Sequence, residues 1–461
     1  MLTWAEFKLQ EPIIRALTEL GFKQPTKIQQ LTLPAAIHGR RDILGAAETG
    51  SGKTLAFGLP ILCGILKLKE KHCCASTSSA ASESELMAPP VDISRPPTGK
   101  PLFALVLTPT RELAIQISRH LIAAAKYTGI RVATIVGGMA AVKQERVLRA
   151  GPEVVVATPG RLWELIGQGQ PHLQQLDMVK FLAIDETDRM IERGHFDELT
   201  PLLERLNADD ERRAARQNFV FSATLTMVHD LPTHLKGKKM TPEQKVNRLI
   251  KMIGMSDTKV VDITIQNLAE TLTESRITCA LEHKDAYLYY IIKRHPGRTI
   301  VFCNSIGSVK RLAQLFTLLK CRPLPLHASM PQRQRIKNLE RFRDDPHGVL
   351  IATDVAARGL DIPHVEHVIH YQVPRTAENY VHRSGRTARA TREGLTILMM
   401  EPAEAYLYAK MCRTLNKSNR VCYNTYNSRS AEPIFLVFDS LDLSPPRIAE
   451  YILKTMKTLL K

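Results

Sequence analysis

The residues best suited to chemistry lie in a glycine-rich stretch near the N-terminus. Residues 45–54 have the sequence GAAETGSGKT; they follow the apolar pair Ile43-Leu44 and precede a helical stretch, Leu55–Leu66. A turn of this kind directs backbone N–H groups at phosphates, and its final lysine and hydroxyl contact the phosphates and Mg²⁺. The pattern predicts a phosphate-binding loop of Ala47, which stands where a glycine is usual, and Glu48, Thr49, Gly50, Ser51, Gly52, Lys53 and Thr54.

Two carboxylates far downstream complement this loop. Asp185 and Glu186 open the quartet Asp-Glu-Thr-Asp at the end of the apolar run Phe181–Ile184. We expect Asp185 and Thr54 to hold Mg²⁺, Glu186 to polarise the attacking water, and Lys53 to contact the β- and γ-phosphates. Each pattern has an ordinary alternative, since glycine-rich turns are often only turns and acidic pairs often only solvated helix surface. Together they predict binding and hydrolysis of a nucleoside triphosphate.

The elements that must position these residues follow an alternating pattern. Short β-rich runs alternate with helical stretches, which predicts parallel sheets with helices on both faces and hence two α/β domains in tandem. The first series of expected strands is Ile43–Leu44, Phe103–Leu107, Val132–Val136, Val154–Ala157, Phe181–Ile184 and Phe219–Ser222. The second series is Thr299–Phe302, Val349–Ala352, His367–His370 and Leu395–Met399.

Composition shifts suggest where the domains end. The expected divisions are an N-terminal domain at 1–232, a basic insertion and linker at 233–273, a C-terminal domain at 274–415 and an atypical tail at 416–461. Residues 70–100 are rich in Ser, Ala and Pro and are expected to form a mobile surface insertion. Residues 233–259 are lysine-rich and show no strand signal, so one helix over the domain junction is expected there.

Overall composition limits the class of protein and its partners. The chain has 461 residues, 44% hydrophobic and 24% charged, with a formal net charge of +17, which favours a polyanionic partner, although a merely basic surface is the alternative. Its eight cysteines include no C-x-x-C pair, which argues against a zinc site or a disulfide framework. Neither a signal peptide nor a run of eighteen apolar residues is found, so no membrane span is expected.

Further motifs follow in a fixed order along the chain. They are GFKQPTKIQ at 21–29, PTRELA at 109–114, GG at 137–138, TPGR at 158–161, SAT at 222–224, VFCNS at 301–305, ATDVAARGLD at 352–361 and HRSGRTAR at 382–389. With Phe7, His327, Gln332 and Arg335, this series resembles the DEAD-box RNA helicases, whose fold is two RecA-like domains. Thr187 in the acidic quartet and the stretches at 70–100 and 233–259 resemble, more narrowly, the nucleolar members that act in large ribosomal subunit assembly.

The resemblance implies roles for residues on both sides of the phosphate loop. Gln29 would pair with adenine and Phe7 would stack on it, which makes the nucleotide ATP; alone, the two would be taken for a surface glutamine and a core aromatic. Asp361 would bind the ribose. The implied RNA-backbone contacts are Pro109, Thr110, Arg111, Gly138, Thr158, Arg161, Gln332, Arg335 and Thr353, where ordinary helix caps and turns are the alternative.

Coupling residues and arginine fingers complete the implied set. Ser222, Thr224 and His382 would link hydrolysis to strand separation. Arg386 and Arg389, three apart and expected on one helix face, would reach the γ-phosphate. Ala388 stands where glycine is common in the family.

The expected function is an ATP-dependent RNA helicase, an ATP hydrolase that closes a cleft on ATP and bends one RNA strand. It would be a nuclear, nucleolar monomer that acts on pre-rRNA with ribosome-assembly proteins. Two alternatives stay open: an ATP-gated RNA clamp that separates no strands, and a DNA translocase, which 2′-OH contacts would exclude.

Overall fold

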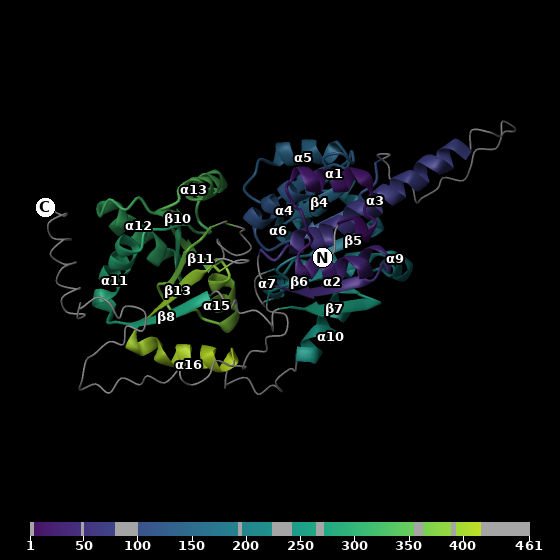
Figure 1. Cartoon of the computed structure of the whole chain (residues 1–461). Helices are drawn as coiled ribbons and strands as arrows, with labels where there is room; N and C mark the ends of the chain where they lie inside the picture. The colour runs from purple at the N-terminus through teal and green to yellow at the C-terminus, as the bar shows by residue number, and fades with distance from the viewer. Residues whose placement is uncertain are drawn as a thin grey trace. The chain divides into compact units, whose positions relative to one another are not determined.

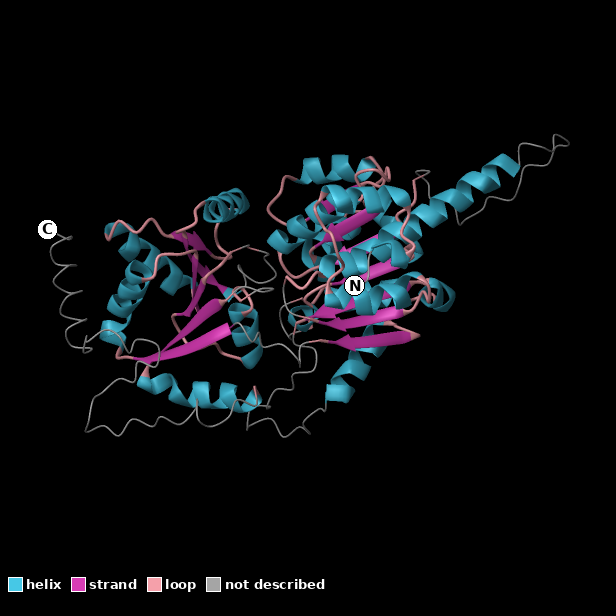
Figure 2. Ribbon diagram, viewed as in Figure 1, coloured by secondary structure: helices cyan, strands magenta, loops and turns pink. Residues whose placement is uncertain are grey.

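The computed structural model describes most of the chain as two compact units (Figure 1). The described residues are 4–47, 50–78, 100–191, 196–223, 242–263, 272–354, 362, 364–388 and 393–415. Those before residue 264 form the first unit, and those from 272 onward form the second. In each unit the strands lie in the middle with helices around them (Figure 2). Among the described residues, no helix is both long and apolar enough to span a membrane.

The first unit is built on a seven-stranded parallel sheet. Its strands, in spatial order, are β3 (Val132–Ile135), β4 (Val154–Ala157), β2 (Ala104–Leu107), β5 (Phe181–Ile184), β6 (Gln217–Ser222), β1 (Asp42–Ala46) and β7 (Thr258–Asp262). Every residue of β1, β2, β4, β5 and β6 is buried, as expected for parallel strands covered on both faces. Successive residues belong to different cores: Ile43 packs with one hydrophobic cluster and Leu44 with the other.

Helices cover both faces of this sheet. They are η1 (Trp4–Phe7), α1 (Glu11–Glu19), α2 (Lys27–Ile37), α3 (Lys53–Ser78), α4 (Arg111–Ala124), α5 (Ala141–Arg149), α6 (Pro159–Gly167), η3 (Pro171–Met178), α7 (Thr187–Met190), α8 (Leu199–Leu206), α9 (Asp210–Ala215) and α10 (Pro242–Ile253). Residues of α1 to α4 share one hydrophobic cluster, and residues of α6, α8 and α10 share the other.

The second unit repeats this architecture with six parallel strands. Their order is β10 (Leu324–Leu326), β11 (Val349–Thr353), β9 (Thr299–Cys303), β12 (His367–His370), β13 (Gly394–Met400) and β8 (Leu272–Thr278). The helices are α11 (Leu281–Arg294), α12 (Ile306–Leu318), α13 (Gln332–Asp344), α15 (Ala377–Ser384), η4 (Pro402–Glu404) and α16 (Ala405–Thr414). The expected pair of tandem α/β domains with parallel sheets is thus confirmed.

The segments between strands differ from expectation in two places, although the helix expected within 233–259 is present as α10. Within the expected linker, α10 packs on the first unit and β7 pairs in parallel with β1 along Asp42–Ala46. No strand was expected there because β7 is an edge strand in which only Val261 is buried. Similarly, α3 continues to Ser78, into the stretch expected to be a mobile insertion. Residues 79–99, like the tail from 416 onward, lie outside the described residues.

Candidate functional site

The phosphate loop connects β1 to α3 at the carboxyl edge of the first sheet. Gly50 and Gly52 have φ values of 83° and 95°, a region that glycine adopts at little cost. The backbone N–H of Ala47 donates to the carbonyl of Ser222 (3.0 Å), which ties the start of the loop to the end of β6. Lys53 begins α3, and its Nζ donates to the carbonyl of Ala47 (2.9 Å). Glu48 and Thr49 lie outside the described residues.

Gln29 contacts this loop directly. It sits in the first turn of α2, where its Oε1 accepts the Thr26 N–H (2.8 Å) while its Nε2 donates to the carbonyl of Gly52 (2.9 Å). Gln29 is only 2% exposed; each of these bonds uses one amide hydrogen or one lone pair, so pairing with a base would use the remaining hydrogen and lone pair. The residue expected to recognise adenine therefore lies against the loop expected to hold the phosphates.

The contact between Gln29 and Gly52 predicts that residue 52 must be glycine for tight ATP binding. A Cβ at this glycine would lie 2.6 Å from Gln29 Nε2, and its φ of 95° disfavours any side chain. We expect Gly52→Ala to weaken ATP binding at least about tenfold, because both the loop and Gln29 must shift. Titration with a fluorescent ATP analogue measures this. Gly167→Ala is the matched control, since a Cβ there would meet nothing within 4 Å beyond its chain neighbours and its own helix; equal affinities in both variants would refute the assignment.

Phe7 does not lie where the resemblance suggested. Only 2% of the residue is exposed, and it packs in the first unit's core beside Trp4, with ring centroids 6.4 Å apart. The Trp4 indole N–H donates to the carbonyl of Phe22 (2.7 Å), which fixes this N-terminal segment. No ring face is open to a base, so the adenine-stacking expectation is wrong and the core reading holds for Phe7.

The acidic motif follows β5 at the same edge as the phosphate loop. Asp185 is buried, and one of its oxygens accepts the backbone N–H of Glu186 (2.9 Å). Glu186 adopts φ 52° and ψ 46°, the left-handed region that is strained for a side-chain-bearing residue. This turn brings Glu186 Oε1 within 3.9 Å of Lys53 Nζ. Burial raises the pKa of Asp185 to about 6, the Lys53 ammonium opposes this shift, and the Glu186 carboxylate adds to it.

The donor set fits a magnesium ion. Mg²⁺ prefers oxygen ligands, and a dication would stabilise the buried charge of Asp185 that desolvation disfavours. Thr54, the second residue of α3, is half-buried and supplies a hydroxyl. Asp185 and Thr54 would hold the ion, which would neutralise charge on the phosphates.

The raised pKa of Asp185 predicts a pH dependence. A metal ligand must be deprotonated, so affinity for Mg²⁺-ATP should fall by about tenfold per pH unit once the pH drops below the pKa of about 6. The pH dependence of this group's contribution to the free energy of unfolding has the opposite sign to that of a salt-bridged aspartate. Because the folded pKa is raised, this group's contribution to the free energy of unfolding increases as the pH falls through that value. Titrations at several pH values with and without Mg²⁺ test this; an equal pH response in both would contradict it.

The residues expected to contact RNA in the first unit follow the ends of β2, β3 and β4. Thr110 caps α4 by accepting the Leu113 N–H (3.3 Å), after Pro109, and Thr158 precedes α6. The Arg111 guanidinium lies against Gly137, where a Cβ would approach its Nη2 to 2.9 Å. Gly138, the next residue, has a φ of 75°, in the left-handed region.

Arg161 has free donor capacity in this group. Its side chain is 10% exposed, and Nη1 pairs with Glu164 (2.6 Å). Nε and Nη2 are buried and hydrogen-bond to no described residue. Buried unpaired N–H groups are costly, and a phosphate oxygen is the acceptor that suits a guanidinium. This favours an anion at Arg161.

The coupling and second-unit residues are placed only in part. Ser222 ends β6, between the strands that carry the two catalytic motifs, while Thr224 lies outside the described residues. In the second unit, Thr353 ends β11, and Gln332 and Arg335 lie in the first turn of α13. Asp361 and Arg389 lie outside the described residues.

Arg386 lies beyond the end of its helix. Helix α15 ends at Ser384, and Arg386 lies in the turn that follows, where its Nε donates to the carbonyl of His382 (2.9 Å). Ala388 has φ 53°, which explains why glycine suits this position. Arg386 therefore lies in a turn rather than in a continuing helix, and it is 1% exposed.

A buried arginine that was not among the expected site residues organises this edge of the second sheet. Arg383 is 1% exposed, and its guanidinium makes two bonds to Asp354, of 2.5 Å and 2.8 Å. It also donates to Asn304 Oδ1 (2.6 Å) and to the carbonyl of Gln372 (3.1 Å). One side chain thus joins α15 to the residues that follow β11, β9 and β12. Its place in the HRSGRTAR motif was the available signal.

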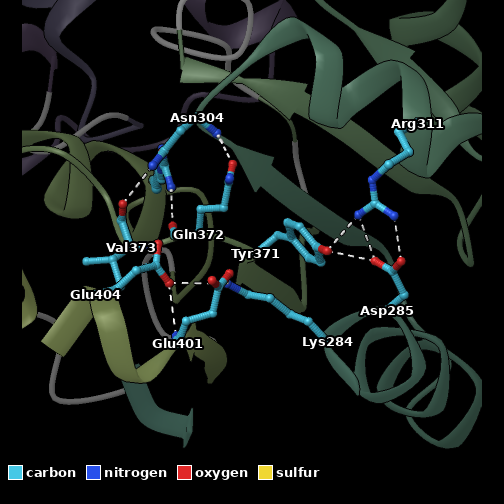
Figure 3. A network of polar contacts seen from close by, with 10 residues as sticks. Lys284, Asp285, Asn304, Arg311, Tyr371, Gln372, Val373, Glu401 and Glu404 are labelled. Carbon is cyan, nitrogen blue, oxygen red and sulfur yellow. Dashed lines mark hydrogen bonds and ion pairs between the residues drawn. The ribbon is translucent and has the colours of Figure 1, made fainter. Parts of the chain in front are cut away.

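The polar network continues behind this edge (Figure 3). Asn304 donates to the carbonyl of Val373 (2.8 Å), whose N–H donates to Glu404 (3.1 Å). The fully buried ammonium of Lys284 forms ion pairs with both Glu404 and Glu401, with N–O distances of 3.2 Å and 2.7 Å. Figure 3 also shows Arg311, Asp285 and Tyr371 meeting in a second group. The segment after β12 is therefore bonded both to Asn304, which follows β9, and to Glu404 of η4.

Comparison with known proteins agrees with this arrangement. Residues 26–231 match the DEAD/DEAH box helicase family, and residues 283–391 match the helicase conserved C-terminal domain. The human ATP-dependent RNA helicase DDX24 is 42% identical, over 91% of this chain and 60% of that protein. ATP-dependent RNA helicase mak5 of Schizosaccharomyces pombe is 42% identical, over 90% of this chain and 60% of that protein. The structure of Mss116p bound to ssRNA and AMP-PNP has a TM-score of 0.71 at 25% identity, over 90% of this chain and 78% of that one.

The fold and the motifs are those of the helicase families that have two RecA-like domains. The chain belongs to the DEAD-box family of ATP-dependent RNA helicases. It spans about 60% of the length of the curated relatives named above. DEAD-box helicases use ATP with Mg²⁺, which agrees with the donor set around Asp185.

Proposed function

We propose that this protein is an ATP-dependent RNA helicase that couples ATP hydrolysis to local duplex unwinding or remodelling of RNA–protein complexes. The observation that carries the proposal is the approach of Lys53 to Glu186 (3.9 Å) beside the buried Asp185. These residues lie in the segments that follow β1 and β5, two strands with β6 between them, and together they supply a phosphate-binding cation, a metal-binding carboxylate and a base.

Each residue has a defined part in the proposed reaction. Lys53 and the loop N–H groups bind the phosphates, and Gln29 holds the loop through Gly52 while it recognises adenine. Glu186 orients the attacking water, which needs its carboxylate fixed in place. Arg386 and Arg389 in the second unit are proposed to stabilise charge on the γ-phosphate, with Asp361 on the ribose.

RNA is the proposed polyanion. Arg161, Arg111 and the helix N-termini at Thr110 and Thr158 offer phosphate contacts without base contacts, which suits a helicase that acts on many sequences. Gly138, Gln332, Arg335 and Thr353 are proposed to extend this surface. The formal charge of +17 supports a nucleic-acid partner, and the related Mss116p was solved with ssRNA.

The narrower proposal is action in large ribosomal subunit assembly, in the nucleolus, on pre-rRNA and with assembly proteins, as a monomer. It rests on similarity to DDX24 and mak5 and on Thr187 in the acidic quartet.

The deciding experiment measures RNA-stimulated ATPase activity and strand displacement of the wild type beside Lys53→Ala. We expect stimulation by RNA but not by DNA, displacement of a short duplex, and loss of both activities in the variant. Equal residual ATPase activity in both proteins would refute the catalytic assignment. Retention of RNA with a non-hydrolysable nucleotide, without strand displacement, would identify a clamp instead.

A further inference from the structure

Thr187 lies at the third position of the acidic quartet, where the family's name-giving residue is alanine. It is fully buried and begins α7, directly after Glu186. Its Oγ1 lies 3.1 Å from the carbonyl oxygen of Ile184 and 3.1 Å from that of Phe221, and the hydroxyl donates its one hydrogen between them.

The second of these bonds is the informative one. A threonine hydroxyl often bonds to a carbonyl three or four residues earlier, which would account for Ile184 without any role in function. Phe221, however, is 34 residues away on β6. The hydroxyl therefore joins the acidic turn after β5 to the neighbouring strand, one residue before Ser222. Alanine cannot make this bond.

Phe221 is itself fixed against the elements that carry the phosphate loop. Its ring lies over Gly45 on β1, where a Cβ would approach Phe221 Cε1 to 2.4 Å. Its ring centroid is 5.8 Å from that of Phe57 on α3. Because close-packed rings transmit displacement, Thr187 connects the acidic turn to the strand and helix on either side of the phosphate loop.

The residue next to Thr187 needs such support. Glu186 adopts left-handed backbone angles, φ 52° and ψ 46°, which persist only where surrounding contacts impose them. One constraint is the bond from the Glu186 N–H to Asp185 (2.9 Å). The Thr187 hydroxyl supplies another on the opposite side of Glu186, and this one reaches outside the turn.

We propose that the Thr187 hydroxyl is a positioning group that holds Glu186 against the phosphate loop for activation of water. This deepens the proposed ATPase function and rests on it. Thr187 is fully buried and directly follows Glu186, so its hydroxyl would act through the backbone of Glu186 rather than by contact with the substrates. Displacement of a catalytic group affects the chemical step more than nucleotide binding.

Three substitutions separate positioning from packing. Thr187→Val keeps the shape and removes the hydroxyl, Thr187→Ser keeps the hydroxyl and removes the methyl, and Thr187→Ala introduces the common family residue. We expect Thr187→Val to lower kcat about tenfold with KM within about twofold, Thr187→Ser to stay near wild type, and Thr187→Ala to resemble Thr187→Val.

The measurements are RNA-stimulated ATPase kinetics, affinity for a fluorescent ATP analogue, and Tm. A fall in kcat for Val and Ala at unchanged nucleotide affinity, with rescue by Ser, supports the proposal. It is overturned if Val retains the wild-type kcat, or if Ser is as impaired as Val. A wild type without RNA-stimulated ATPase activity would refute the proposed function itself, which is a distinct outcome.

Discussion

Replacing Glu186 with glutamine is expected to lower the ATPase kcat by about a thousandfold while ATP still binds. Glutamine keeps the size of the side chain but cannot accept a proton from water, and general-base removal costs about 10²–10⁴ in rate. The Glu186 carboxylate is buried and lies 3.9 Å from the Lys53 ammonium, so the substitution removes a negative charge from within the proposed active site. Single-turnover hydrolysis and a fluorescent-nucleotide titration separate the two effects.

Glu211→Gln provides the matched control for this experiment. Glu211 is an exposed residue of α9, and the same chemical change there should leave kcat within about twofold of wild type. If Glu186→Gln retained more than about a tenth of the wild-type rate, another group would have to act as the base.

Replacing Arg383 with methionine is expected to destabilise the second unit by about 3–5 kcal/mol, because removal of one partner of a buried ion pair leaves the other charge uncompensated. The guanidinium is 1% exposed, and its bonds reach Asp354, Asn304 and the carbonyl of Gln372. Methionine fills much of the volume but supplies no donor. We expect faster hydrogen exchange in peptides from β11, β9 and α15.

Two internal comparisons make this result specific. Arg333→Met makes the same change at an exposed position of α13 and should alter exchange little. Both tryptophans, Trp4 and Trp163, lie in the first unit, so their fluorescence on denaturation should be unchanged in Arg383→Met. Unaltered exchange in α15 would show that the Arg383 network contributes little to stability.

Much of the fold was accessible from the sequence because buried parallel strands are continuous apolar runs. β4, β5 and β12 have the bounds expected from their sequences, and other central strands differ by one or two residues at their ends. The strands that were missed, β7, β8 and β10, lie at the edges of the sheets, where one side lacks a neighbour and polar residues are tolerated.

The helical expectation for Arg386 failed for a related reason, while Arg389 lies outside the described residues. Charged residues three apart suggest one helix face, but Ala388 takes a left-handed φ of 53° that no α-helix accommodates. A single sequence does not reveal this angle, since alanine ordinarily favours helix.

The phosphate loop and the acidic quartet could be identified from the sequence alone, because phosphate binding and metal binding require particular residue types at short spacings. The distance between the two motifs in space could not be predicted, since it depends on β6 lying between β5 and β1 and on the left-handed turn at Glu186. Only the tertiary structure places Gln29 on Gly52, buries Phe7 in the core, and brings the Thr187 hydroxyl to the Phe221 carbonyl. These contacts join residues far apart in the chain, and packing between strands and helices, rather than local sequence, decides them.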